Sequence, residues 1–429
     1  MAREYAPFFQ LRTRSVLKQA QQYLCGLVQS ARRNVERMAE VVPGTDAQAL
    51  HHFLTHSPWE SRPVMDQVAR DLDALVGGDP DTCLVLDESC IAKKGTQSVG
   101  VARQWMGTEG KTDNCQVAVF AALVRGRWVG LADAELYLPK EWVADSARCE
   151  AAGVPVERRV LKSKPQLGLE MVRRARTNGL SFSWVAADAN YGKDGTFLRA
   201  LDDAGEVFVA DVHRDQRVFL QEPHRSVKSL RADTWANEQP AEAWRTVRVR
   251  HSTQGELWVE ALHRRVWVRR KGESQARCWH LIVTREVGSP ETVKYSLSNA
   301  PATTSTQRLA YMQRQRYWVE RLFQDAKNEA GLDEYQARGW RAWYHHIALV
   351  MMAMLFLLRE RLEQAQTLPL LSVRDVKVLL ARFLPRRDFD FDELIRQMHK
   401  RHKQRQAAID SANRRQRNNQ YRGRPKVTK

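Results

Sequence analysis

Hydrophobic and polar positions follow two different periods in the first half of the chain. Up to about residue 76, apolar residues such as Leu17, Leu24 and Leu27 recur at the spacing of one helical face, which predicts helices. After the turn-forming segment GGDPD, the predicted strands are CLVLD, SVGVARQW, NCQVAVFAALV and RGRWVGLADAELYL. A helix is predicted over PQLGLEMVRRARTNG, and a further strand over FSWVAAD. The pattern therefore predicts a helical start followed by a mixed α/β sheet.

The period changes twice more toward the C-terminus. Short, alternating, arginine-rich segments predict a β-rich region after about residue 204: WRTVRVR, ELWVEAL, RRVWVRR and CWHLIVTRE. From Thr304 onward the pattern is helical again. Its longest apolar run, Ile347–Leu358, is too short to span a bilayer of roughly 30 Å and predicts a buried core helix. From His399 the chain carries one acid, Asp410, among many bases, so we expect it to be disordered when unbound.

Composition adds a strong positive charge to this picture. Lys and Arg number 68 and Asp and Glu 50, which gives a net charge of +18. Such a surplus on a large chain favours a polyanionic partner, most commonly nucleic acid, and a basic surface kept for solubility is the alternative. The six cysteines form no C-x-x-C pair, which argues against a zinc ribbon and a secreted disulfide scaffold. The N-terminus lacks the apolar core of a signal peptide, so we expect a cytoplasmic protein.

Three acids stand out by their positions. The predicted strands LVLD and FSWVAAD each end in an aspartate, Asp87 and Asp188, and the helical segment RYWVERLFQDAKNEAG carries Glu320. Arg316 lies four residues before this glutamate and Lys327 seven after it, so the three share one helical face. Carboxylates converging from two strands and a helix can hold two Mg²⁺ ions about 3.5–4 Å apart for phosphodiester chemistry. For the helix alone, a salt-bridged surface row is the simpler interpretation.

Neighbouring acids are weaker candidates for this site. Asp87 and Glu88 point to opposite faces of a strand, so only one of them faces the site. Asp194 lies in a predicted loop after Gly192 and is expected to be a helix cap. Among the acids close to Glu320, no other has its spacing to Arg316 and Lys327.

Taken together, five segments resemble the DDE transposases of bacterial insertion sequences, in particular insertion-sequence family 701 within the broader family 4 group. These segments are DESCIAKKGTQSVGVARQW, DNCQVAVF, LYLPKEWVAD, WVAADANYG and RYWVERLFQDAKNEAGLDEYQ. The resemblance runs from about Ala49 to Met354. It implies an RNase H-like mixed-sheet catalytic domain of the α/β (α+β) class, with a β-rich insertion between the second aspartate and the glutamate.

The resemblance also implies a function. It implies Mg²⁺-dependent cleavage at terminal inverted repeats, with Mn²⁺ as a substitute, and strand transfer into target DNA. Asp87, Asp188 and Glu320 are then the catalytic residues and metal ligands. The Tyr-Arg-Glu-Lys signature of the wider group is matched by Arg316, Glu320 and Lys327, but Gln313 stands at the tyrosine position. The first motif reads DESC, whereas DETG-like or DESG-like residues are usual.

Basic and aromatic residues supply the candidate DNA contacts. The basic candidates are Lys93, Lys94, Arg103, Arg316, Lys327 and, in the tail, Arg414, Arg415 and Arg417. The candidates for base stacking are Trp244, Trp258 and Trp267. The alternatives are a solvated turn for the lysines, a solvated extension for the tail, and core positions for the tryptophans.

Five segments follow from these expectations. Residues 1–76 are a predicted helical N-terminal DNA-binding domain, and residues 77–203 the first part of the catalytic domain. Residues 204–303 are the β-rich insertion, residues 304–362 the second part of the catalytic domain, and residues 363–429 a helical C-terminal region with a basic tail. The family implies a homodimer on double-stranded DNA, associated with the nucleoid. Two alternatives remain open: a nuclease that cuts without joining, and a catalytically inert DNA-binding repressor.

Overall fold

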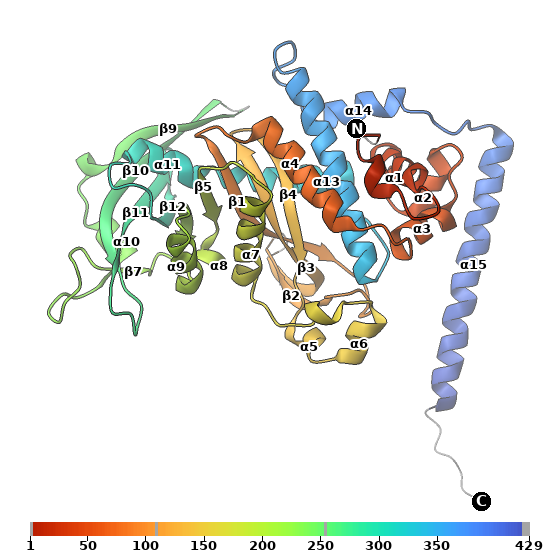
Figure 1. Ribbon diagram of the computed structural model, residues 1–429, viewed down its shortest axis with the longest axis horizontal. Helices are drawn as coiled ribbons and strands as arrows, with labels where there is room; N and C mark the ends of the chain where they lie inside the picture. Colours follow the sequence, from red (N-terminus) through yellow and green to blue (C-terminus); the bar gives the residue numbers. More distant parts are fainter. Residues whose placement is uncertain (1–2, 108–109, 253–254, 423–429) are drawn as a thin grey trace, which may run out of the picture.

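A ten-stranded mixed sheet forms the centre of the computed structural model, which describes residues 3–107, 110–252 and 255–422 of the 429-residue chain (Figure 1). Its strand order is β2-β3-β1-β5-β6-β12-β11-β10-β9, and β4 pairs with β3. The strands are β1 (Thr82–Ala92), β2 (Ala102–Met106), β3 (Lys111–Arg125), β4 (Trp128–Leu136), β5 (Trp184–Ala187), β6 (Phe208–Val212), β9 (Arg245–Ser252), β10 (Gly255–Val268), β11 (Arg277–Glu286) and β12 (Ser289–Ser298). The predicted α/β class is confirmed.

Parallel pairing in this sheet is confined to β1, β5 and β6, and the other pairs are antiparallel. The central strands are covered on both faces, which explains why Cys83–Leu86 and Trp184–Ala187 are uninterrupted apolar runs. A separate two-stranded sheet joins β7 (Arg217–Val218) and β8 (Leu230–Arg231).

Helices cover both faces and one end of the sheet. They are α1 (Leu17–Gln29), α2 (Val35–Val41), α3 (Ala47–Thr55), α4 (Ser61–Val76), α5 (Lys140–Val143), α6 (Ser146–Ala151), α7 (Lys164–Thr177), α8 (Ala189–Gly192), α9 (Gly195–Asp203), α10 (Ala232–Asn237), α11 (Thr306–Arg314), α12 (Tyr317–Ala330), α13 (Trp340–Glu363), α14 (Val373–Phe383) and α15 (Phe391–Arg422). Three short 3₁₀ helices are η1 (Ala6–Phe9), η2 (Val156–Arg158) and η3 (Ala241–Ala243). The N-terminal helices share one hydrophobic core with the sheet.

The apolar helix α13 lies inside the protein, as its sequence predicts. It packs against α4, α12 and strand β4. By length and composition it is the one described helix that could cross a membrane, but 89% of its most apolar stretch is buried within the protein. It therefore has the character of a core helix.

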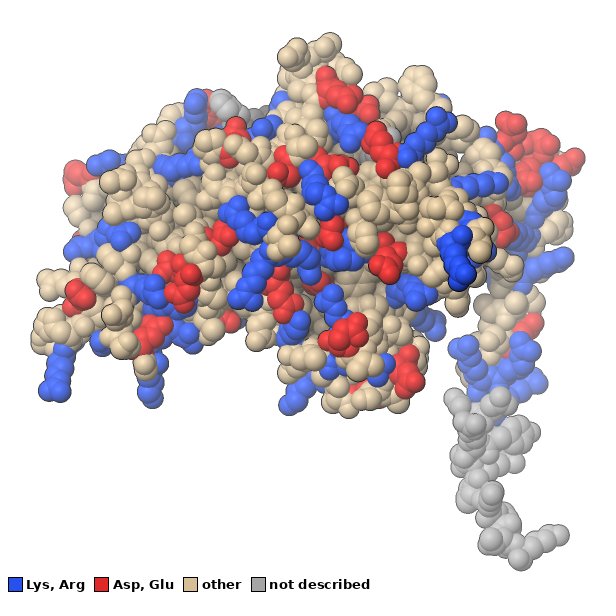
Figure 2. Space-filling view, in the orientation of Figure 1, with Lys and Arg blue, Asp and Glu red and all other residues tan. Residues whose placement is uncertain are grey.

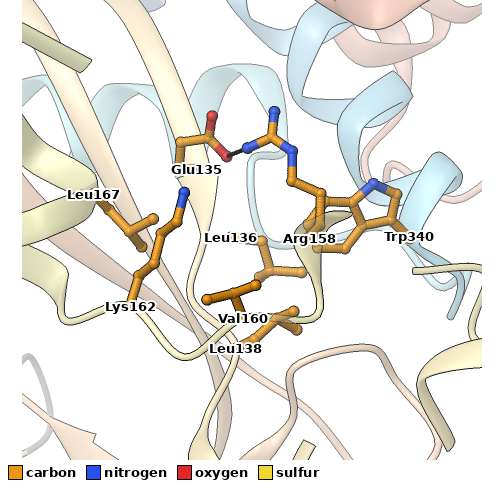
Figure 3. Close-up of a pocket in the computed structure, with 8 residues that line it drawn as sticks. All are labelled: Glu135, Leu136, Leu138, Arg158, Val160, Lys162, Leu167 and Trp340. Atoms are coloured by element: carbon orange, nitrogen blue, oxygen red, sulfur yellow. Dashed lines mark ion pairs between the residues drawn. The ribbon is translucent and has the colours of Figure 1, made fainter. Parts of the chain in front are cut away.

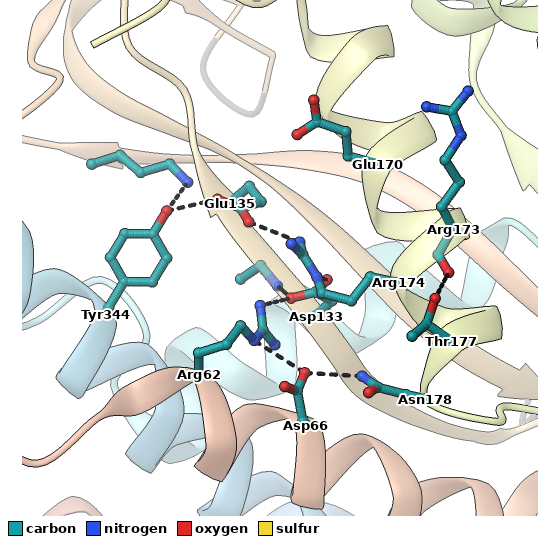
Figure 4. Close-up of polar contacts among 12 residues, drawn as sticks. Arg62, Asp66, Asp133, Glu135, Glu170, Arg173, Arg174, Thr177, Asn178 and Tyr344 are labelled. Atoms are coloured by element: carbon teal, nitrogen blue, oxygen red, sulfur yellow. Dashed lines mark hydrogen bonds and ion pairs between the residues drawn. The ribbon is translucent and has the colours of Figure 1, made fainter. Parts of the chain in front are cut away.

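A buried cluster of charges fastens three helices to strand β4 (Figure 4). Arg174 of α7 contacts both Asp133 Oδ2 and Glu135 Oε1 at 2.7 Å. Arg62 of α4 contacts Asp133 at 2.8 Å, and the Tyr344 hydroxyl of α13 donates to Glu135 at 2.7 Å. Because each buried acid has more than one partner, the cluster fixes how these helices sit on the sheet.

Three expectations about elements are wrong. Strand β1 does not end at Asp87 but continues to Ala92, because ESCIA keeps pairing with β3 up to Ala92 opposite Cys115. ELWVEAL and RRVWVRR form one strand, β10, whose pairing with β11 runs unbroken from Val259 to Val268. The tail is not disordered between His399 and Arg422: it continues α15, since Lys, Arg, Gln and Ala are good helix formers. Residues 423–429 lie outside the described residues.

The predicted insertion belongs to the central sheet. Strand β12 pairs with β6 over Tyr295–Ser298, and β11, β10 and β9 extend the sheet beyond it. The segment is β-rich, as its alternating pattern predicts, and Figure 1 shows it at the end of the sheet opposite α1–α3. The division of the chain into five segments with separate roles stays a prediction.

Candidate active site

Two predicted catalytic acids lie on adjacent parallel strands. The register pairs Leu86 of β1 with Ala187 of β5, so Asp87 and Asp188 each follow one residue later. Residues at equivalent positions of neighbouring strands lie side by side, about 4.8 Å apart across the sheet. Asp188 caps α8 by accepting hydrogen bonds from the backbone N–H groups of Asn190, at 2.9 Å, and Tyr191, at 3.4 Å. This cap fixes the second carboxylate at the end of β5.

A third aspartate continues this row. Ala187 pairs with Ala210 of β6, which places Asp211 beside Asp188. Sequence reasoning missed Asp211, although the segment VFVAD repeats the signal used for the other two aspartates, an apolar strand followed by Asp. The three parallel strands thus carry one aspartate each at the same level.

Arg316 joins acids from the sheet and from helix α12. Its Nη1 donates to Asp87 Oδ2 at 2.7 Å, and its Nη2 donates to Glu320 Oε1 at 2.9 Å. Its Nε lies 3.4 Å from Asp211 Oδ2. The four-residue spacing predicts that Arg316 and Glu320 share one helical face, and there the two side chains form an ion pair. The same arginine side chain also contacts Asp87.

The pKa of Asp87 reflects the balance of charges around it. Burial raises the pKa of its carboxyl group to about 7; Arg316 opposes this rise, and the negative charges of Asp188 and Glu320 add to it. Burial lowers the pKa of Arg316, but the surrounding carboxylates outweigh burial and raise it overall. The carboxylates around Arg316 thus lie together in a partly buried site, and their negative charges favour the binding of a positively charged group there.

Glu88 occupies the other face of β1, as expected from strand geometry. It forms an ion pair with Lys164 of α7, whereas Asp87 faces α12. Asp194 is the predicted helix cap: its carboxylate accepts from the backbone N–H groups of Thr196, at 2.9 Å, and Phe197, at 3.2 Å. Both acids therefore already have structural partners away from Arg316.

A buried hydrogen-bond chain supports the site from the insertion side. Thr284 Oγ1 of β11 donates to Gln313 Oε1 at 2.5 Å, and Gln313 Nε2 donates to Ser296 Oγ of β12 at 2.7 Å. The Ser296 hydroxyl then donates to Asp211 Oδ1 at 2.6 Å. Gln313, at the family's tyrosine position, is only 3% exposed and connects the insertion with the acids. Its connecting role depends on contacts distant in sequence, which periodicity does not reveal.

The basic residues predicted to contact DNA differ in how available their side chains are to solvent. The Lys93 ammonium donates to the Tyr335 carbonyl at 2.9 Å and lies 3.8 Å from the centroid of the Tyr335 ring. Burial lowers the pKa of Lys93 to about 8. Lys327 donates to the Cys90 carbonyl at 3.3 Å. Lys94 and Arg103 are exposed. The tail arginines, Arg414, Arg415 and Arg417, are exposed on α15.

The three tryptophans proposed for stacking have unequal access to solvent. Trp258 is 41% exposed, whereas Trp244 is half-buried under the Arg285 guanidinium, 4.0 Å from the ring centroid. Trp267 is half-buried in β10 and pairs with Phe219. Trp105 of β2, which sequence reasoning passed over, is the most exposed of the described tryptophans at 63%.

The small pocket in Figure 3 lies elsewhere. Glu135, Arg158 and Trp340 are among its lining residues, which come from β4, η2 and α13, and none of the three predicted catalytic acids lines it. Arg158 and Glu135 form an ion pair across it at 3.5 Å. The pocket therefore adjoins the charge cluster under β4 rather than the carboxylates around Arg316.

The carboxylates suit divalent cations in their chemistry. Asp87, Asp188 and Glu320 offer only oxygen donors, which Mg²⁺ and Mn²⁺ prefer. The buried Asp87 carboxyl beside two like charges would be stabilised by added positive charge, which Arg316 supplies in part. Within the described ranges, no three His, Cys, Asp or Glu side chains are placed so that they could hold a metal ion together. The donor set fits a divalent cation, with Arg316 lying between two of its members.

Comparisons with known proteins agree with this chemistry. Residues 7–256 match the family model described as DDE superfamily endonuclease, a range that contains Asp87 and Asp188. Over 309 residues the chain is 26% identical to a protein of Microchaete diplosiphon described as a probable transposase for insertion sequence element IS701, covering 71% of this chain and 72% of that protein.

A solved structure with partial likeness is the NurA nuclease of Sulfolobus solfataricus. It shares 9% identity and a TM-score of 0.25, over 72% of this chain and 91% of that one, a likeness too low to bear on fold or function. DDE endonucleases generally use divalent metals, in keeping with the carboxylates around Arg316. Because the family match spans more than half of its length, this chain belongs to the DDE superfamily of endonucleases.

Proposed function

We propose that the chain is the transposase of an insertion sequence, which cleaves DNA at the element's terminal inverted repeats and joins the ends to target DNA. The observation that carries the proposal is the convergence of Asp87 and Glu320 on Arg316, with Asp188 on the strand next to Asp87. Similarity to a probable IS701 transposase supports the same activity.

In this proposal Asp87, Asp188 and Glu320 hold Mg²⁺, or Mn²⁺ in its place. When bound, such ions lower the pKa of coordinated water and stabilise charge on the phosphodiester oxygens. Arg316 already pairs with two of these acids, so it keeps their charges balanced before DNA arrives. Its remaining hydrogen-bond capacity suits a phosphate oxygen.

The proposal assigns DNA binding to exposed basic groups. Lys94 and Arg103 lie on the segment that follows Asp87, and Arg414, Arg415 and Arg417 are exposed on the tail. Such contacts hold the phosphate backbone without reading sequence. The N-terminal helices and the tail would bind the inverted repeats within a homodimer, in the bacterial cytoplasm.

Cleavage of a labelled element end tests the proposal. With Mg²⁺ or Mn²⁺ we expect nicking at the repeat boundary, lost in Asp87→Asn, Asp188→Asn and Glu320→Gln while DNA binding persists. The matched controls are Glu88→Gln, on the opposite face of the same strand, and Asp194→Asn, a helix cap; both should cleave. Chelation with EDTA should stop cleavage by the wild type.

The same assay separates the alternatives. Supplied with ends carrying a free 3′-hydroxyl, a transposase should give joined products, and a nuclease should give none. Binding without cleavage by the wild type in either metal would refute the enzymatic proposal and favour a DNA-binding repressor.

A further inference from the structure

Helix α15 presents an apolar face to solvent. Phe391, Leu394, Ile395 and Met398 follow the helical spacing i, i+3, i+4, i+7, and their exposed fractions are 75%, 43%, 40% and 45%. Phe389, just before the helix, is 49% exposed. An exposed stripe of this kind marks an interaction site more often than chance.

The side of α15 that faces the protein is polar instead. Gln397 is 7% exposed and donates to the Glu40 carbonyl of α2 at 3.5 Å, and Arg401 binds the Glu40 carboxylate at 3.0 and 2.6 Å. Glu393, one turn before Gln397, accepts from Arg387 at 3.2 Å. Polar contacts thus attach the helix to its own chain, and the apolar side chains are left for another surface.

We propose that this apolar face binds the same face of a second copy of the chain, with the two α15 helices antiparallel. The spacing is self-complementary in that direction. A two-fold axis between Leu394 and Ile395 sets Leu394 of one copy against Ile395 of the other, and Phe391 against Met398. All four exposed side chains are then covered.

The distribution of charge along α15 also favours antiparallel pairing of the two copies. The segment 388–393, DFDFDE, contains four acids, and the segment 396–405, RQMHKRHKQR, contains five Lys or Arg residues and no acid. Figure 2 shows acidic side chains near the start of α15 and basic ones farther along it. Antiparallel pairing sets the acidic segment of each copy against the basic segment of the other, whereas parallel pairing would set like charges together.

The size of the face predicts the strength of association. At about 200 Å² for a fully exposed large apolar side chain, these four residues and Phe389 expose roughly 500 Å² per copy. Two copies would bury less than the ~1,200 Å² at the lower end of standard interfaces, so we expect weak, micromolar association. The inference deepens the homodimer of the proposed function by naming the surface that forms it.

Sedimentation of the full-length protein without DNA or metal tests the inference. We expect the mass to rise from monomer to dimer across the micromolar range. Leu394→Glu should weaken this association at least tenfold. Ile409→Glu is the matched control, because Ile409 is 54% exposed on the same helix but lies outside the paired segment, and it should leave association unchanged.

Disulfide cross-linking tests the direction of pairing. Phe391→Cys and Met398→Cys proteins should cross-link when mixed and not when oxidised separately, with the wild type as the background for native cysteines. Cross-linking of each variant with itself, a monomer at every concentration, or equal losses in Leu394→Glu and Ile409→Glu would each overturn the inference. Neither assay involves cleavage, so a dimer that cuts no DNA would refute the proposed function alone.

Discussion

Removing Arg174 tests whether the buried charge cluster on β4 stabilises the fold. The side chains of Asp133 and Glu135 are 7% and 2% exposed, and Arg174 contacts both (Figure 4). Arg174→Met leaves two nearly buried carboxylates with fewer partners. Removing one member of a buried ion pair typically costs about 3–5 kcal/mol. Because Arg62 and Tyr344 still contact the acids, we expect a loss of about 3 kcal/mol in the free energy of unfolding.

Urea unfolding followed by circular dichroism measures this loss. Arg173→Met is the matched control, since Arg173 precedes Arg174 on α7 but is exposed, and it should change the free energy of unfolding by less than about 0.5 kcal/mol. Arg174→Lys keeps the charge but not the forked geometry, so an intermediate loss is expected.

Neutralising the acids isolates the electrostatic cause. Asp133→Asn and Glu135→Gln introduced together should recover part of the stability lost in Arg174→Met, because no unpaired buried charge remains. The reasoning is refuted if Arg174→Met unfolds at the same urea concentration as Arg173→Met, or if neutralising both acids recovers nothing.

Three further predictions concern other parts of the molecule. Burial lowers the pKa of His346 to about 3, below its ordinary 6.5, so the unfolded chain takes up the proton first and stability falls as pH drops below 6.5. The loss from this residue should reach about 2 kcal/mol at pH 5, and His346→Gln should flatten the profile of unfolding free energy between pH 6 and 4. Lys94→Ala should weaken DNA binding and reduce the slope of log affinity against log salt concentration by about 1. Lys93→Ala should mainly lower the melting temperature, because Lys93 packs on Tyr335. The reverse outcome would contradict this packing. Asp211→Asn should slow single-turnover cleavage about tenfold with DNA affinity unchanged, and a normal rate would exclude a role in holding Arg316.

Much of the sheet follows from local pattern in the sequence. The buried strands β1 and β5 are uninterrupted apolar runs, and Asp188 follows its strand as predicted. Asp87 is different: the acids Asp87 and Glu88 interrupt the apolar run, but pairing with β3 carries the strand through them. A polar interruption of an apolar run therefore does not mark the end of a strand here.

What the sequence hides depends on distant contacts. The packing of Lys93 on Tyr335 joins residues more than two hundred positions apart, and no periodic pattern reports it. The burial of Gln313 between Thr284 and Ser296 depends on how α11 meets the insertion. Asp211, in contrast, follows the same local pattern, an apolar strand followed by Asp, that identified Asp87 and Asp188 as candidates.

The pairing of β12 with β6 limits how this protein can be shortened. Without the segment from β7 through β12, β6 would become an open edge of the sheet, with unpaired backbone groups next to Asp211. Open edges recruit other strands and promote aggregation. A minimal version made by deleting residues 217–298 would therefore need a replacement strand or a covering loop at β6. The same constraint predicts that natural relatives with shorter insertions shield this edge in another way.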